Sequence, residues 1–130
     1  MISQLAAHVR RLVKDGFDQV GARGYHYRIL AALHEFGLSS QIDLARRCGM
    51  DRSDVVAAIN ELVAEGQVER APDPDDRRRN VVSITKVGER QLKRLDRAIE
   101  HVQEELLEPL SVEDRRTLTD LLTRLLDHHG

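Results

Sequence analysis

The apolar positions near the N-terminus follow the period of a helix. They recur at alternating steps of three and four residues: Ile2, Leu5, Val9 and Leu12. Side chains with this spacing lie on one face of a helix, which we expect over about residues 2–14. Three glycines then indicate a linker: Gly16, Gly21 and Gly24. A second apolar run predicts a helix over about 25–36, which Gly37 ends.

Two short helices are expected next, over about 41–48 and 52–65, with a turn of about three residues that contains Gly49 between them. Each begins with the same arrangement, an N-cap followed three residues later by an acidic side chain: Ser40 with Asp43, and Asp51 with Asp54. The second helix should bury four apolar side chains: Val55, Ile59, Leu62 and Val63. This spacing is typical of a helix-turn-helix.

The period then changes to that of β-structure. Val68 begins an extended run that ends near Pro72, and β-prone residues return over 81–85, so we expect a hairpin around a basic turn. A long helix over about 86–107 follows, with an apolar seam at Leu92, Leu95, Ile99, Val102 and Leu106. Pro109 breaks it. The last helix carries an apolar stripe of Leu118, Leu121, Leu122 and Leu125.

Composition restricts the class of protein. The chain has 130 residues, 41% apolar and 32% charged, as expected for one folded domain. No apolar run approaches the roughly 18 residues that span a bilayer and no signal peptide is visible, so we expect a cytoplasmic protein without a membrane partner. Cys48 is the single cysteine, which excludes an internal disulfide. Two tyrosines, two phenylalanines and no tryptophan disfavour a stacking platform for single-stranded nucleic acid.

Charge is distributed unevenly, although the net charge is only −2. Residues 70–94 hold eight basic and four acidic side chains, whereas residues 95–130 hold four basic and nine acidic ones. The basic segment includes the expected hairpin turn. This asymmetry indicates one face for an anionic partner.

These elements form the layout of a winged helix-turn-helix over about residues 25–85, flanked by dimerisation helices over about 1–14 and 86–130. We therefore expect a single domain of residues 1–130 that is mainly α-helical and contains a small β-hairpin. Five stretches are distinctive: Leu44-Ala45, Asp51-Arg52-Ser53, Leu62 to Gly66, and Asp75-Asp76-Arg77-Arg78-Arg79 leading to Ile84-Thr85-Lys86-Val87-Gly88. Through them the sequence resembles the MarR family of bacterial transcription factors. The resemblance extends over nearly the whole chain.

The resemblance implies a homodimer that inserts the helix over 52–65 of each subunit into the major groove of double-stranded DNA and lays the hairpin, or wing, along the minor groove. Arg78 matches the family's wing-tip arginine and Asp76 its orienting carboxylate. A planar cation is attracted to narrow A·T-rich minor grooves. In the plainer interpretation these residues form a solvated turn with weak surface ion pairs. The candidate contacts of the wing are Asp76, Arg77, Arg78 and Arg79.

In the helix that would enter the major groove, Val56 and Ala57 stand where relatives often carry Thr and Arg, so readout by hydrogen bonds is reduced. Arg52 is a candidate for guanine or phosphate and Ser53 for phosphate. Asn60 is a candidate for adenine or backbone, or else an ordinary exposed residue. Val56 and Ala57 can contact thymine methyl groups. The candidate DNA contacts outside the wing are Ser40, Gln41, Arg52, Ser53, Val56, Ala57 and Asn60.

Apolar residues at the two ends of the chain have no second layer to cover them within one subunit. Left exposed they would form a large apolar patch, whereas a second copy related by a two-fold axis would bury them. We therefore expect a homodimer whose interface includes Ile2, Leu5, Val9, Leu118, Leu121, Leu122 and Leu125.

The resemblance also implies a small aromatic or anionic effector that weakens DNA binding. The effector would bind in a cleft between the dimerisation helices and the DNA-binding lobe, which the first helix and the start of the second would border; the candidate residues there are His8, Arg11, Tyr25 and His26. The plainer alternative makes His8 and Arg11 surface residues and Tyr25 a partly buried anchor. Cys48 is expected to be a buried, unactivated thiol. The histidines lack metal-ligand spacing, and we expect no metal and no cofactor.

Two classes of function remain open. The first is a sequence-specific, homodimeric repressor of a pseudo-palindromic operator, with half-sites about one helical turn apart. The second is a helical protein–protein interaction module with a vestigial winged helix, which the small net charge and the sparse polar surface of the 52–65 helix favour. An enzyme is not expected, because the sequence has no phosphate-cradling glycine loop, nucleophile motif or paired carboxylates.

Overall fold

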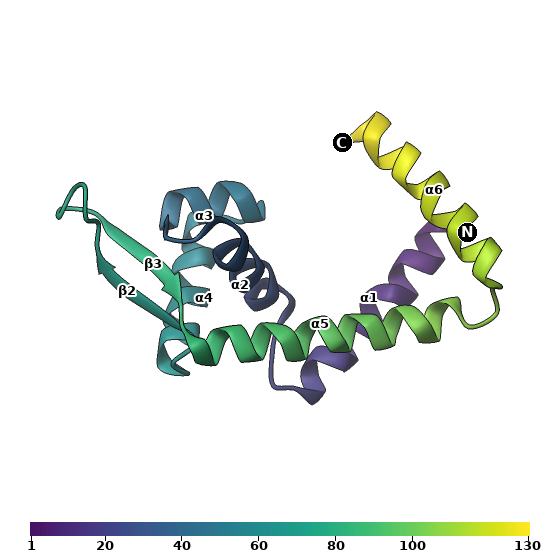
Figure 1. Cartoon of the computed structure of the whole chain (residues 1–130), viewed down its shortest axis with the longest axis horizontal. Coiled ribbons are helices and arrows are strands. Elements are labelled where there is room, and N and C mark those ends of the chain that lie inside the picture. The colour runs from purple at the N-terminus through teal and green to yellow at the C-terminus, as the bar shows by residue number, and fades with distance from the viewer.

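The computed structural model describes residues 1–130, as helices and a small sheet arranged along one long helix (Figure 1). In chain order the elements are α1 (Ile2–Gln19), α2 (Gly24–Phe36), β1 (Ser39–Ser40), α3 (Gln41–Cys48), α4 (Arg52–Ala64), β2 (Val68–Pro72), β3 (Asn80–Ile84), α5 (Lys86–Leu107) and α6 (Val112–His129). The winged module of α2, α3, α4 and the strands lies at one end of α5, whereas α6 and both chain termini lie toward the other. This is the expected winged helix-turn-helix. No helix is both long and apolar enough to cross a lipid bilayer.

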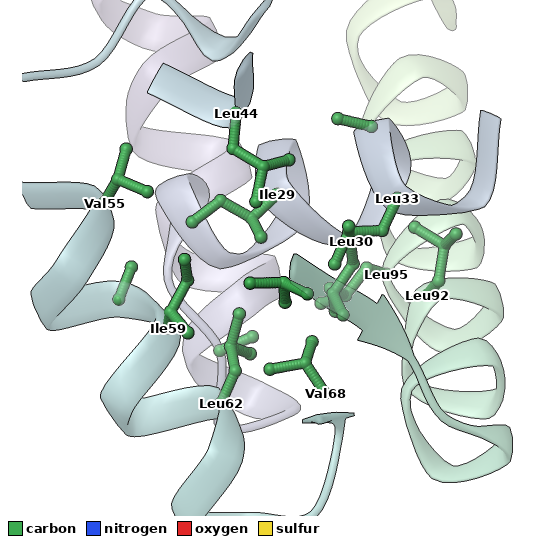
Figure 2. Packing of buried hydrophobic residues seen from close by; sticks show 14 of the residues in the cluster. Ile29, Leu30, Leu33, Leu44, Val55, Ile59, Leu62, Val68, Leu92 and Leu95 are labelled. Atoms are coloured by element: carbon green, nitrogen blue, oxygen red, sulfur yellow. The ribbon is translucent and has the colours of Figure 1, made fainter. Parts of the chain in front are cut away.

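One hydrophobic core holds the winged module together. Its fully buried side chains come from α2, α3, α4, the two longer strands and α5: Ile29, Leu30, Leu33, Leu44, Val55, Ile59, Leu62, Val68, Val82 and Leu95. Figure 2 shows the labelled side chains of α2, α4 and α5 directed toward a common centre. Burying each such aliphatic side chain stabilises the fold by about 1.5–3 kcal/mol. Because α4 and both wing strands share this core, they form one body.

A third strand, which the sequence pattern did not reveal, completes the antiparallel sheet in the order β1-β3-β2. β1 consists of Ser39 and Ser40, which pair with Val82 and Val81 of β3. Two polar residues carry no alternation from which a strand can be detected. β2 and β3 form the expected hairpin. β1 therefore attaches the beginning of α3 to the wing strand β3.

The structure confirms the predicted N-cap residues of α3 and α4, but only that of α3 forms a capping hydrogen bond through its side chain. Oγ of Ser40 accepts a hydrogen bond from the backbone N–H of Asp43 at 3.1 Å, so the predicted cap of α3 is confirmed. Gly49 ends α3 in the left-handed conformation, with φ of 61°. Asp51 is the N-cap residue of α4 and Asp54 lies in its first turn, as predicted, but the side chain of Asp51 forms no capping hydrogen bond. The first turn of α4 is held by the burial of Val55 instead.

The contacts at the start of α5 explain the Thr85-Lys86-Val87-Gly88 motif. Oγ1 of Thr85 accepts from the backbone N–H of Gly88 at 3.1 Å and donates to the carbonyl oxygen of Gly66 at 2.6 Å. A β-carbon on Gly88 would overlap the carbonyl oxygen of Gln67. The turn that follows α4 thus touches the backbone of α5, and only glycine fits there.

Two expectations about helices were wrong. α1 continues through Gly16 to Gln19 instead of ending near residue 14, and Gly24 is the first residue of α2. A β-carbon on Gly16 would lie 3.5 Å from Cγ2 of Val102, so this glycine marks the place where α1 packs on α5 and not a linker. Val63 is 37% exposed, because it lies to one side of the buried stripe of α4.

Candidate nucleic-acid interface

The second helix of the helix-turn-helix, α4, has one buried and one exposed face. The side chains in the core are Val55, Ala58, Ile59 and Leu62. At about 100° per residue, the opposite face carries Ser53, Val56, Ala57 and Asn60. Val56 is half-buried and the other three are exposed. The structure therefore brings these four candidate DNA contacts onto one surface.

A small concavity beside this face brings together residues from three separate segments. It is lined by Ser40, Gln41 and Ile42 at the start of α3, by Arg52 at the start of α4, and by Arg79 and Asn80 where the wing tip joins β3. Two arginines and the N-terminus of a helix thus border one space of about 210 Å³. These groups bind phosphate oxygens well, since both present N–H donors and positive charge. The concavity is chemically suited to one phosphate of a nucleic-acid backbone.

The tip of the wing, residues 73–79, is a hydrogen-bonded basic turn. Oδ1 of Asp76 accepts from the backbone N–H and from Nε of Arg78, each at 3.1 Å, and the backbone N–H of Arg79 donates to the carbonyl oxygen of Asp76. These bonds from Arg78 lower the pKa of the Asp76 carboxyl below its ordinary value. The side chain of Arg78 is 91% exposed. Its guanidinium is therefore oriented from one side and open to an anionic partner on the other.

Sequence reasoning missed one residue of this surface, Arg70 on β2. Its Nη2 donates to Oδ1 of Asn60 at 2.6 Å. The alternation of β2 contained a signal for it, because Arg70 lies two positions after the buried Val68 and hence on the same face of the sheet. A basic side chain on that face, beside α4, was a candidate from the strand pattern alone.

Polar contacts on the other flank fix α4 relative to α2. Oε2 of Glu61 lies 2.7 Å from Nε2 of the buried His26 and accepts from the hydroxyl of Tyr25 at 3.5 Å. Two of the candidate effector-binding residues are thus engaged with α4. The other two, His8 and Arg11, contact each other on the exposed surface of α1. None of the larger concavities of the single chain is lined by both pairs.

Comparisons with known proteins identify this arrangement. The sequence profile of the MarR family matches residues 21–79, which include the helix-turn-helix and the wing up to Arg79. A putative transcriptional regulatory protein for the hcr operon of Thauera aromatica is 36% identical over 133 residues, covering 96% of this chain and 80% of that protein. The chain belongs to the MarR family.

Solved MarR structures share the fold over nearly the whole chain. The apo form of MarR from E. coli has a TM-score of 0.88 and 21% identity, with 96% of this chain and 93% of that chain covered. A mutant of the same protein complexed with operator DNA has a TM-score of 0.78 and 21% identity, with 96% and 90% covered. The uncharacterized HTH-type transcriptional regulator YdgJ of Bacillus subtilis is 30% identical over 97 residues, and this chain covers 59% of its length.

In this MarR-family chain, the candidate dimer residues lie on α1 and α6, away from the wing. α6 buries none of its side chains within the single chain. The predicted interface residues that are between 48% and 82% exposed are Ile2, Leu5, Leu121, Leu122 and Leu125. Val9 and Leu118 are half-buried. A single subunit therefore leaves two apolar helix faces uncovered.

Cys48, at the end of α3, is half-buried against the core and not buried as expected. Its thiol donates to the carbonyl oxygen of Arg28 at 3.5 Å, and the guanidinium of Arg28 donates to the carbonyl oxygen of Cys48 at 3.2 Å. Partial burial raises the pKa of the thiol, which disfavours the nucleophilic thiolate. The structure gathers no three His, Cys, Asp or Glu side chains into a metal site.

Proposed function

We propose that this MarR-family regulator is a cytoplasmic, homodimeric repressor that binds a pseudo-palindromic operator in double-stranded DNA. The observation that carries the proposal is the shared surface formed by the outward face of α4, the concavity between Arg52 and Arg79, and the wing tip. All three belong to one body built on one core. The complex of E. coli MarR with operator DNA, which has the same fold, supports duplex DNA as the partner.

The contacts divide between positioning and readout. Arg52 and Arg79 bind backbone phosphate, which sets the register of α4 without reading sequence. Val56 and Ala57 offer no hydrogen bonds and contact thymine methyl groups. Much of the specificity therefore comes from Arg78, which enters a narrow A·T-rich minor groove beside the half-site.

The homodimer follows from the uncovered faces of α1 and α6. The occupant of these faces is a second copy of the chain, because a two-fold axis pairs identical apolar stripes. The acidic C-terminal segment then lies away from the DNA, at the end of α5 opposite the wing (Figure 1). Two copies of α4 related by this axis meet the same side of the duplex about 34–36 Å apart, which requires a pseudo-palindromic site.

A groove on α1 supports release of the DNA by a small aromatic anion. It has a volume of about 710 Å³, an apolar wall, three basic side chains and one acidic one, Asp18, which forms a salt bridge with Lys14 and leaves the two arginines free of it. The apolar residues are Val9, Val13, Phe17 and Ala22, and the basic ones are Arg10, Lys14 and Arg23. An aromatic carboxylate matches both features, because its ring packs on the wall and its charge faces the cations. Release of labelled operator by aromatic carboxylates, but not by their neutral amides, tests this part of the proposal.

The experiment that tests the function is selection of bound sequences from a randomised duplex library at two salt concentrations. We expect a two-fold symmetric site with half-sites one helical turn apart, and an affinity that falls steeply with salt because phosphate contacts release counterions. Salt-sensitive binding without enrichment would contradict sequence-specific regulation. Complete lack of duplex binding would favour the protein–protein interaction module.

Arg78→Ala tests the wing on the selected site. We expect the variant to lose about 1–3 kcal/mol of binding free energy and to relax the preference for A·T steps beside each half-site. Arg90→Ala is the matched control, because Arg90 is exposed on the side of α5 away from the core and its removal changes the charge equally. Wild-type affinity and site preference in Arg78→Ala would rule out this role for the wing.

A further inference from the structure

The carboxamide of Asn60, on the outward face of α4, has a fixed orientation. Nη2 of Arg70 lies 2.6 Å from Oδ1 of Asn60. A guanidinium has five N–H donors and no acceptor, so the amide oxygen and not the nitrogen must face it. The Nδ2 amino group of Asn60 therefore points away from Arg70.

This orientation changes what the surface can recognise. A freely rotating asparagine reads adenine with both edges of its amide, accepting from the N6 amino group and donating to N7. In this chain the oxygen faces a cation, and an adenine amino group brought to it would meet the donors of Arg70. The groups left to face a base are the Nδ2 hydrogens of Asn60 and the remaining N–H groups of Arg70, all of which donate.

Arg70 is also available to a base because its charge is not neutralised within the protein. It takes part in none of the salt bridges of the chain. The neighbouring outward residues of α4, Val56 and Ala57, have no hydrogen-bonding side chains that compete for the same base edge. The pair therefore supplies most of the hydrogen-bonding capacity at the middle of this face.

We infer that Arg70 and Asn60 act together as a donor-only reader of one guanine in each half-site. Guanine presents two adjacent acceptors, N7 and O6, in the major groove, whereas adenine presents one acceptor and one donor there. The inference rests on the proposed DNA binding. It replaces the adenine expected for Asn60 alone and adds Arg70 as a residue that determines specificity.

The test compares wild type, Arg70→Ala, Asn60→Ala and the double variant on the selected operator. The position read by the pair is the one whose preference changes in Asn60→Ala, and affinities are then measured on four operators that differ only there. We expect wild type to favour guanine over adenine by about 10-fold. In Arg70→Ala the amide can rotate, so adenine becomes equal or preferred, and the double variant discriminates less than either single variant.

Several results would overturn the inference. Arg70→Ala would contradict it by lowering the affinity equally on all four operators and making the affinity less dependent on salt, as expected for a phosphate contact. An unchanged preference for guanine in Arg70→Ala would also contradict it. A wild-type preference for adenine at this position would do the same. Arg90→Ala controls for the lost charge, and thermal unfolding confirms that each variant is folded. Failure of the proposed function can be distinguished from failure of this inference, because in the first case the wild-type protein would enrich no sequence from the library.

Discussion

At the scale of single residues, Gly88 is the glycine with the least free space around its Cα. A β-carbon there would overlap the carbonyl oxygen of Gln67 and lie 2.7 Å from Cγ1 of Ile84, so the start of α5 would have to shift. We expect Gly88→Ala to lower the free energy of unfolding by about 1–3 kcal/mol, measured by denaturant titration. Gly24→Ala is the control, since a β-carbon on Gly24, at the start of α2, would meet no atom within 4 Å. Equal losses in the two variants would contradict the steric argument.

The carboxyl of Asp76 gives a prediction about pH. Its hydrogen bonds from Arg78 lower its pKa in the folded protein, so this stabilising interaction is present above the unfolded pKa and is lost as the pH falls through the folded one. The effect is confined to acid below about pH 4. We expect an NMR titration to give Asp76 a pKa below its unfolded reference in wild type and a smaller lowering in Arg78→Ala, where the backbone N–H of residue 78 and the charge of Arg79 still act on the carboxyl. Identical titrations would mean that Arg78 does not hold the carboxylate in solution.

Among elements, those with local signals were predicted from the sequence and those with distant partners were not. Ser40 and Gly49 define α3 through contacts within a few residues, and the structure confirms both. The continuation of α1 through Gly16 depends instead on packing against α5, which offsets the roughly 1 kcal/mol that glycine costs inside a helix. β1 and the contact between Arg70 and Asn60 likewise depend on partners that only the fold brings near.

The N-cap of α3 has two roles that substitutions at Ser40 separate. Its Oγ satisfies the backbone N–H of Asp43, and the residue lines the proposed phosphate concavity. We expect Ser40→Ala to lower the free energy of unfolding by about 1 kcal/mol, because the cap is lost. Ser40→Asp keeps a capping oxygen and hence stability, but repels phosphate and weakens operator binding. If folded Ser40→Asp bound the operator with wild-type affinity, the phosphate would not bind in this concavity.

In the whole molecule, the surface proposed for DNA and the surface proposed for the dimer lie at opposite ends of α5 (Figure 1). The wing could be predicted from its sequence motif, and the apolar stripes of α1 and α6 from helical periodicity. Periodicity does not give the distance between the two copies of α4 in the proposed homodimer, which depends on how α1 and α6 pack across the axis. We therefore expect the geometry of the dimer to determine operator spacing, although no predicted interface residue lies on the surface proposed for DNA.

This dependence predicts the outcome of placing a charge in the apolar stripe of α6. Leu122 is 49% exposed in the single chain and would be covered by the second copy. Leu122→Asp buries an unpaired carboxylate in that interface, so we expect monomers or aggregates in light scattering and loss of operator binding, because a single α4 and wing hold only one half-site. Thr123→Asp introduces the same charge on the opposite face of α6, so this variant should remain dimeric and bind the operator. A stable Leu122→Asp monomer that binds the full operator with wild-type affinity would show that DNA recognition does not need the dimer.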